Sequence, residues 1–246
     1  MKNSTSYSQN SEDQVIEMIF SNIGFKTKIF IEFGFDWHEN NSRYLLENYG
    51  FHGLFIDANI PEGAQGPNGI HFHRAWITRD NINNIISGYY TGEVDFLSID
   101  VDGVDLYLLD CIDIVSPRVV CIEYCASIGK NLSVTVPYKD DFDRHAAHPS
   151  GFFCNASLKA NINVMKKKGY KFVRSVAGLN AFFVREDCEL KELSCEEGWE
   201  PHHSRTYEVH SRWDGTTRAV SPEIQFEWIE DLPWVSVSDK GIIATE

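Results

Sequence analysis

Acidic side chains recur at the ends of segments that have the apolar pattern of buried strands. Acids stand at or just beyond the ends of four of five such segments: Glu32, Asp36, Asp57, Asp100, Asp102, Asp105 and Glu123. Because the carboxyl ends of parallel strands meet at one edge of a sheet, we expect these groups to share a ligand-binding crevice. Crowded carboxylates repel one another and need a partner. Ribose hydroxyls, an amino group, a metal ion, or the guanidinium groups of Arg43 and Arg74 would each serve.

Asp57 has the most specific pattern of these acids. It ends the second strand-like segment, 23 residues after Gly34. This spacing is typical of an acid that binds both ribose hydroxyls of a nucleotide-type cofactor. The alternative is an ordinary strand-end aspartate that caps a turn.

The segment Asp100–Asp105 places three carboxylates within six residues. Hard oxygen donors at this density suit Mg²⁺, Mn²⁺ or Ca²⁺, although the twelve-residue loop of an EF-hand is missing. The alternative is a structural role, in which Asp102 or Asp105 caps a helix over residues 104–112.

Histidines form two groups. His145 and His148 lie in the polar segment 139–148, where an imidazole is suited to act as a general base near neutral pH. The alternative there is a solvated polar loop. The second group, His202, His203 and His210, has no metal-binding spacing, so we expect these three side chains to lie on the protein surface.

The six cysteines include no CxxC pair, so we expect free thiols and no zinc site.

Alternating strands and helices must position these groups. Strand-like runs cover residues 28–34, 53–58, 71–78, 93–103 and 118–124, and helical segments cover 11–24, 40–50, 81–90 and 104–112. A helix over 156–169 and a hairpin over 170–186, turning at Ala177-Gly178, close the pattern. This order predicts an α/β, Rossmann-like class I methyltransferase fold. We expect a mostly parallel central sheet, a C-terminal antiparallel hairpin, and helices on both faces.

Composition limits the partners. The 246 residues include 22 basic and 36 acidic side chains, a net charge of −14, which argues against nucleic acid as the main partner. No apolar run is long enough to span a membrane. The polar N-terminus lacks the hydrophobic core of a signal peptide, so we expect a cytoplasmic protein. A homo-oligomer is compatible with the sequence.

The charge is uneven, which indicates two parts. Residues 186–246 hold 15 of the acids but only 5 of the basic residues. We expect a methyltransferase-like domain over 1–187, with an N-terminal helix within 1–25, and an acidic extension over 188–246. The extension contains four tryptophans, Trp199, Trp213, Trp228 and Trp234. They indicate that it packs on the core as a lid or an interface.

The chain resembles the FkbM-like branch of class I S-adenosylmethionine (SAM) methyltransferases. The matching segments run in order over residues 7–187: YSQNSEDQVI, FIEFG with LLENYGFHGLFIDA, AWITRDNIN, FLSIDVDGVDLYLL, PRVVCIEY with VTVPY, and ASLKANINVMKKKGYKFV with GLNAFFVRED. The resemblance implies a SAM-dependent O-methyltransferase for a small polar acceptor, such as a sugar or glycan hydroxyl, with Mg²⁺ as an assisting ion.

The resemblance also implies site residues. Those implied for SAM are Glu32, Gly34, Asp36, Asp57, Ala58, Arg74, Ala75, Trp76 and Asp100. Within this set, Glu32 and Gly34 would lie beside the amino-acid end of SAM, Asp57 on its ribose, and Arg74–Trp76 near its adenine. Asp100 would lie near the transfer site, with His145, His148 or an acid of the 100–105 segment as the base. Asp100, Asp102 and Glu123 would hold Mg²⁺.

One loop departs from the family. After Gly34 the family has a second glycine, whereas this chain has the bulky Phe35, Trp37 and His38. The cofactor then sits differently, Trp37 stacks on it, or SAM binding has been lost. Two further functions stay open: a degenerate methyltransferase fold that serves as a binding or assembly protein, and a metal-dependent enzyme of another reaction type.

Overall fold

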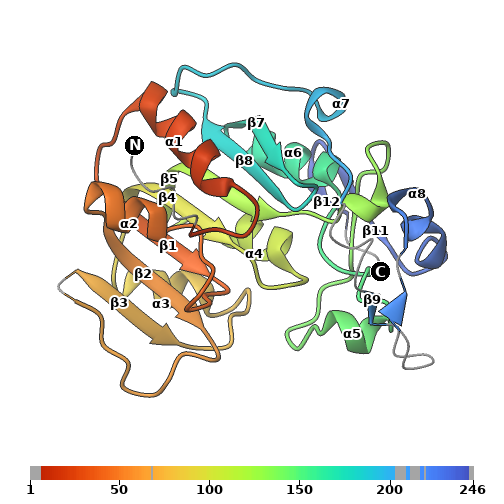
Figure 1. Cartoon of the computed structure of the whole chain (residues 1–246), viewed down its shortest axis with the longest axis horizontal. Coiled ribbons are helices and arrows are strands. Elements are labelled where there is room, and N and C mark those ends of the chain that lie inside the picture. The colour runs from red at the N-terminus through yellow and green to blue at the C-terminus, as the bar shows by residue number, and fades with distance from the viewer. Residues whose placement is uncertain (1–6, 68, 203–208, 211–216, 219, 244–246) are drawn as a thin grey trace.

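A seven-stranded sheet forms the centre of the molecule, as the computed structural model shows (Figure 1). The structure describes residues 7–67, 69–202, 209–210, 217–218 and 220–243. The sheet strands are β1 (Ile29–Phe33), β2 (His52–Asp57), β3 (Ile70–Arg74), β4 (Gly92–Ile99), β5 (Val115–Glu123), β7 (Tyr170–Val176) and β8 (Asn180–Arg185). Their order is β3-β2-β1-β4-β5-β8-β7, in which β8 runs antiparallel to both neighbours and the rest are parallel. The predicted fold class is confirmed.

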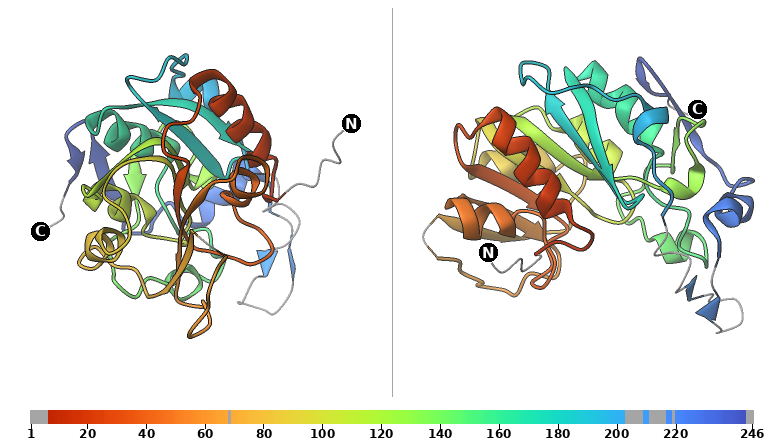
Figure 2. Two further views of the ribbon diagram at one scale, coloured as in Figure 1. Left: turned by 90° about the vertical axis from the view of Figure 1, so that its left-hand side faces the viewer. Right: turned by 45° about the horizontal axis from the view of Figure 1, so that its top comes forward.

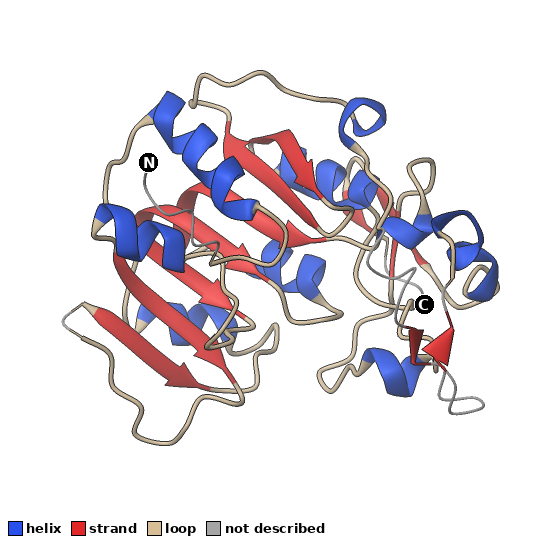
Figure 3. Cartoon of the chain, viewed as in Figure 1, coloured by secondary structure: helices blue, strands red, loops and turns tan. Residues whose placement is uncertain are grey.

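Helices cover both faces of the sheet (Figure 3). The helices α1 (Glu12–Ile23) and α2 (Arg43–Tyr49) pack on one face, and α3 (Ile82–Ser87), α4 (Asp105–Cys111) and α6 (Leu158–Lys167) pack on the other. Successive strand residues point to opposite faces, so Phe30 packs with Ile16 of α1, whereas Ile31 packs in the core that includes Leu108 of α4. This double burial explains the near-continuous apolar runs of the parallel strands.

Much of the remaining chain lies beyond the carboxyl ends of the parallel strands, whereas its last two strands pack on α6 (Figures 1 and 2). Between β5 and α6 the chain forms an insert (residues 124–157), which contains η1 (Ala126–Ile128), β6 (Val134–Thr135) and α5 (Arg144–Ala147). The later elements are α7 (Cys195–Gly198), β9 (Val209–His210), β10 (Thr217–Arg218), α8 (Pro222–Gln225), η3 (Phe226–Trp228), β11 (Val235–Ser238) and β12 (Gly241–Ile242). Strand β11 pairs with β6, so the end of the chain returns to the insert.

Apolar side chains join the insert to the C-terminal segment. Val220 and Ile229 are buried against Val136, Phe152 and Phe153. Trp228 and Trp234 pack at the edge of this cluster, whereas Trp213 lies outside the described residues. Among the described residues, no helix is both long and apolar enough to cross a bilayer. All six cysteines are free.

Candidate functional site

One row of residues crosses the sheet at the carboxyl ends of its parallel strands. Strand register pairs Asp57 with Arg74, and Glu123 with Asn180. Phe33 pairs with Ile56 on one side and Ile99 on the other, so Gly34, the next residue, stands between Asp57 and Asp100. From β3 to β8 the row is Arg74, Asp57, Gly34, Asp100, Glu123 and Asn180.

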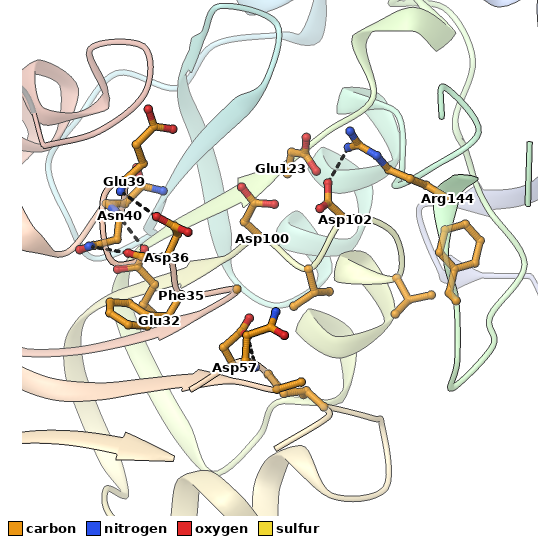
Figure 4. A pocket seen from close by; sticks show the side chains of 18 of the residues that line it. Glu32, Phe35, Asp36, Glu39, Asn40, Asp57, Asp100, Asp102, Glu123 and Arg144 are labelled. Carbon is orange, nitrogen blue, oxygen red and sulfur yellow. Dashed lines mark hydrogen bonds and ion pairs between the residues drawn. The ribbon is translucent and has the colours of Figure 1, made fainter. Parts of the chain in front are cut away.

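A cleft of about 870 Å³ opens over this row (Figure 4). All the site residues expected from the sequence line the cleft except Arg74, His148 and the buried Asp105. The N-terminal segment adds Ser8 and Gln9, and the insert adds residues 140 and 142–145. The predicted convergence of the strand-end acids is therefore present in the structure.

Gly34 lets two strands touch under the cleft. Its φ is +77°, and a Cβ at this position would lie 1.4 Å from the backbone oxygen of Asp100. No other residue fits so close to a neighbouring backbone. The Gly34 N–H also donates to the oxygen of Ile56 at 3.2 Å, which ties the first turn to β2.

The bulky loop after Gly34 does not close the cleft. The ring of Phe35 packs 4.4 Å from that of Phe55, and the ring of Trp37 lies 5.0 Å from that of Phe72 (centroid distances). These rings cover the side of the sheet formed by β2 and β3, and the cleft still reaches Gly34 and Asp57.

Glu32 fixes the end of the loop that follows Gly34 through hydrogen bonds to its backbone. Its two carboxylate oxygens accept the N–H groups of Asn41 at 2.9 Å and Ser42 at 2.8 Å, just before α2. Burial raises the pKa of Glu32. Asn41, which sequence reasoning missed, lines the cleft and donates to Ser98 Oγ at 3.0 Å. Glu32 therefore shapes one wall of the cleft through the backbone that it binds.

Asp57 caps a turn and also lines the cleft, where the predicted ribose-binding role stays a prediction. Its Oδ1 accepts the N–H of Asn59 at 2.6 Å, which is a turn-capping contact, and the residue lines the cleft. Burial and the negative charge of Asp36 raise the pKa of Asp57. Asp36 itself accepts the N–H of His38 at 2.7 Å. The carboxylates of Asp36 and Asp57 thus face the same part of the cleft (Figure 4).

The segment after β3 borders the cleft next to Asp57. Ala75 donates its N–H to the oxygen of Asp57 at 3.2 Å. Trp76 is 57% exposed, and its Nε1 donates to the backbone oxygen of Asp140 in the insert. Arg74 instead donates to the oxygen of Ala58 at 3.2 Å and does not line the cleft.

A group of three carboxylates lies in the middle of the row. Each of Asp100, Asp105 and Glu123 offers an oxygen within 4.8 Å of the others. Burial, together with the charges of Asp102 and Asp105, raises the pKa of Asp100 well above its usual range. Burial raises the pKa of Asp105 to about 7. Such mutual repulsion is relieved by a proton or by a bound cation.

The structure changes the expected membership of this group. Asp102 turns away with a φ of +61° and pairs with Arg144 at 2.5 Å, so Asp105 takes its place beside Asp100 and Glu123. Asp105 also accepts the N–H groups of Val101 at 2.9 Å and Gly103 at 3.0 Å. These two N–H groups precede α4, whose N-cap is Val104 without a side-chain hydrogen bond, so the helix-capping role weighed for Asp102 or Asp105 is wrong.

Glu123 and Asn180 extend the row to the antiparallel strand. Glu123 is buried and accepts the side-chain amide of Asn155. Asn180 lines the cleft and donates through Nδ2 to Glu12 Oε1 at 3.0 Å. Sequence reasoning missed both asparagines. The register of the predicted hairpin against the fifth strand is the signal that would have placed Asn180 beside Glu123.

The histidines separate in the structure. His145 lines the cleft. His148 does not: its Nδ1 lies 2.8 Å from Ser150 Oγ, and burial lowers its pKa. The surface expectation is wrong for His202, which is buried, lines the cleft and lies 3.1 Å from the oxygen of Ala177 through Nδ1. His203 and the side chain of His210 lie outside the described residues.

Comparisons with known proteins give distant structural similarities. No protein-family model matches the chain, and no curated protein matches it. An O-methyltransferase family protein from Burkholderia thailandensis is 10% identical over 72% of this chain and 57% of its own, with a TM-score of 0.42. A candidate hemolysin from Lactococcus lactis is 12% identical over 78% of this chain and 96% of its own, with a TM-score of 0.45.

The N-terminal domain of EvdMO1, crystallised in the presence of S-adenosylhomocysteine (SAH) and D-fucose, is 12% identical. The match covers 73% of this chain and 83% of that domain, with a TM-score of 0.40. Similarity at this level does not identify an activity. The cleft and its residues therefore carry the functional conclusion.

Proposed function

We propose that the protein is a SAM-dependent O-methyltransferase whose acceptor is a small polar molecule, such as a sugar or glycan hydroxyl. The observation that supports this most is the row from Asp57 through Gly34 and Asp100 to Glu123, which lies under one cleft of about 870 Å³. A crevice at the carboxyl ends of parallel strands, near the switch in strand order, is where α/β sheets bind nucleotide-like ligands.

The residues of the cleft fit SAM. Gly34 lines the cleft where the amino-acid end would lie, and the Asp57 carboxylate, which lines the same cleft, can accept ribose hydroxyls. The excess of carboxylates suits a cation, and SAM when bound supplies an electrophilic methyl group on a positively charged sulfur. Trp76 and Ala75 border the same side of the cleft and offer apolar surface for a base.

The chain itself would orient the acceptor and hold its proton. Methyl transfer needs alignment of the acceptor oxygen and a group that takes its proton. His145 lines the cleft, as does Asp100, whose pKa is raised well above its usual range by burial and by the charges of Asp102 and Asp105. These two side chains are the bases that we propose.

The carboxylate group also fits Mg²⁺. Asp100 and Glu123 would be the main ligands, because both oxygens of Asp105 already accept backbone N–H groups. Mg²⁺ commonly uses one or two carboxylates and keeps several waters. When bound, the ion would lower the pKa of an acceptor hydroxyl.

Calorimetry with SAH tests the function. We expect SAH to bind the wild-type protein, and Asp57→Ala to weaken binding by about 10- to 100-fold, since it removes an acceptor for buried ribose hydroxyls. Asp80→Ala, which removes an exposed aspartate outside the cleft, is the control and keeps the wild-type affinity. Absence of SAH binding, with and without Mg²⁺, contradicts the proposal.

The same titration separates the other two functions. A metal-dependent enzyme of another reaction type would bind Mg²⁺ or Mn²⁺ at Asp100 and Glu123 without binding SAH. A binding or assembly protein would bind neither.

We also propose that residues 188–246 act as a lid or an interface beside the cleft, because Ile229 and Trp234 pack on the insert that lines it.

A further inference from the structure

The N-terminal segment, residues 7–10, is fixed against the start of α1. The N–H of Tyr7 donates to Asp13 Oδ2 at 2.7 Å, and the N–H of Asp13 donates to Ser8 Oγ at 3.1 Å. These two bonds hold the segment against the first turn of the helix. Ser8 and Gln9 line the cleft from this position, which is outside the sheet.

The N-terminal segment is also bound to the loop that precedes α2. The oxygen of Tyr7 accepts the N–H of Asn40 at 3.2 Å. The guanidinium of Arg43, which pairs with Glu47 at 3.7 Å, lies 5.2 Å from the centroid of the Tyr7 ring. Since two residues of chain span at most about 7 Å, Gln9 lies at the end of the cleft that this loop borders.

This end of the cleft is where the proposed function places the amino-acid part of SAM. Asp36, Glu39 and Asn40 of the loop line it (Figure 4). The amino-acid part carries one ammonium and one carboxylate group. The carboxylate of Asp36 is complementary to the ammonium group, whereas the carboxylate of the ligand requires N–H or O–H donors. A side chain that donates hydrogen bonds at this end is therefore suited to bind it.

Among the described residues, three side-chain amides line this end of the cleft, and two of them already donate to the protein. Asn40 Nδ2 donates to the oxygen of Asp36 at 3.1 Å, and Asn41 Nδ2 donates to the hydroxyl group of a β4 serine at 3.0 Å. Gln9 is the third amide. Its Oε1 accepts Asn10 Nδ2 at 3.3 Å, whereas its Nε2 donates to no residue that the structure describes. Because Gln9 is exposed, both hydrogens of Nε2 are available to a ligand.

We propose that the side-chain amide of Gln9 binds the carboxylate group of SAM. This inference rests on the proposed function and adds a cofactor-binding residue that lies outside the sheet. The hydrogen bonds of Tyr7 and Ser8 already hold the backbone of the segment, so little chain has to be ordered when the cofactor binds. The N-terminal segment then distinguishes SAM from adenosine derivatives that lack the carboxylate.

Three related ligands test the proposal by calorimetry on the full chain: SAH, decarboxylated SAH, which keeps the ammonium group, and methylthioadenosine, which lacks both charged groups. SAH is titrated first, because absence of its binding contradicts the proposed function and not this inference alone. We expect Gln9→Ala to weaken SAH binding about tenfold, since one hydrogen bond to a charged group is lost. The affinities for the other two ligands, measured by competition with SAH where direct binding is weak, should stay within about twofold of wild type.

Charged substitutions at the same position give a test of sign. Gln9→Glu should weaken SAH binding more than Gln9→Ala does and strengthen the binding of decarboxylated SAH, because the added charge repels a carboxylate and attracts an ammonium group. Gln9→Lys should change both affinities in the opposite directions. Gln14→Ala removes an exposed glutamine of α1 that does not line the cleft, so it is the matched control and keeps all wild-type affinities.

Two results overturn the assignment of Gln9. Wild-type affinity for SAH in Gln9→Ala shows that the amide does not bind the cofactor. An equal loss for all three ligands shows that Gln9 supports the shape of the cleft and does not recognise the carboxylate.

Discussion

Gly34 lets β1 and β4 approach each other under the cleft because it has no Cβ. Any side chain there places Cβ against the Asp100 backbone, where the strands β1 and β4 cannot separate without losing their hydrogen bonds. We expect Gly34→Ala to lower the free energy of unfolding by more than about 3 kcal/mol, or to prevent folding. Urea denaturation measures this loss.

Gly50→Ala is the matched control for that substitution. Gly50 also has a positive φ, of +66°, but a Cβ there meets nothing within 4 Å. The variant should lose only about 1–2 kcal/mol, the strain of a left-handed alanine. Similar losses for both variants would show that backbone conformation, and not the contact with Asp100, is what position 34 requires.

Asp105 gives the protein a pH dependence of its own. Burial raises the pKa of Asp105 in the folded state to about 7, above the value near 4 in an unfolded chain. The folded state then binds more protons between these two values, so this contribution to stability is full below about pH 4 and is lost as the pH rises to about 7. The contribution is at most about 4 kcal/mol.

The comparison of wild type with Asp105→Asn isolates this effect. The variant has no titrating carboxyl at 105, so the wild type should lose stability relative to it as the pH increases from about 4 to 7. Urea unfolding at several pH values in this range provides the free energies. Parallel curves for the two proteins would show that the carboxyl at 105 does not take up a proton on folding.

Strand-end acids were predictable as a set, but their individual roles were not. Their positions follow from the apolar runs, whereas the choice of Asp105 over Asp102 beside Glu123 depends on a left-handed turn at Asp102. Such a turn is a rare conformation that cannot be predicted from the residue type alone. The burial of His202 against Ala177 arises from segments far apart in the sequence.

At the scale of elements, a buried ion pair fixes the connection between α1 and β1. Asp95 on β4 accepts the N–H groups of Lys26, Thr27 and Lys28, and it pairs with Arg118 of β5 at 3.0 Å. Arg118 also donates to the carbonyl groups of residues 23 and 24. One carboxylate and one guanidinium thus satisfy the backbone of a loop that has no secondary structure.

Removing the charge of Asp95 should loosen that connection. We expect Asp95→Asn to lower the free energy of unfolding by about 3–5 kcal/mol, because it leaves Arg118 buried without its counter-ion. Chemical denaturation measures the loss, and the exposed pair variant Glu47→Gln should change stability by less than about 0.5 kcal/mol. Since Asp95 does not line the cleft, the folded variant should bind SAH like the wild type. A weaker SAH affinity would show that the two ends of the sheet are coupled.

Helices and strands were predictable where the pattern of apolar residues extended over a whole element and depended on the local sequence alone. The near-continuous apolar runs of β1, β2, β4 and β5 predicted a parallel sheet that is buried on both faces, and the turn at 177–178 predicted the hairpin. The pairing of β6 with β11 was not predictable, since each is short and their residues lie about a hundred positions apart. Their register depends on tertiary packing and not on the local sequence.

At the scale of the whole molecule, separate parts of the chain form the walls of the cleft. The sheet supplies the row from Asp57 to Asn180, the N-terminal segment Ser8 and Gln9, the insert Asp140 and His145, and the segment after α7 His202. The insert is in turn supported by the C-terminal segment through one apolar cluster. Loss of that cluster should therefore loosen the wall that the insert forms and leave the sheet unchanged.

Ile229 tests this dependence because it is fully buried in the cluster beside Phe152 and Phe153. We expect Ile229→Ala to destabilise the cluster by about 2–5 kcal/mol. Hydrogen exchange followed by mass spectrometry should then show faster exchange in residues 136–153, while peptides from β1 and β4 keep their protection. Ile224→Ala, at a position of the same segment that is 40% exposed, should leave both unchanged. Unaltered exchange in the insert of the Ile229 variant would mean that the insert holds its shape alone, and residues 220–243 would then have no part in forming the cleft.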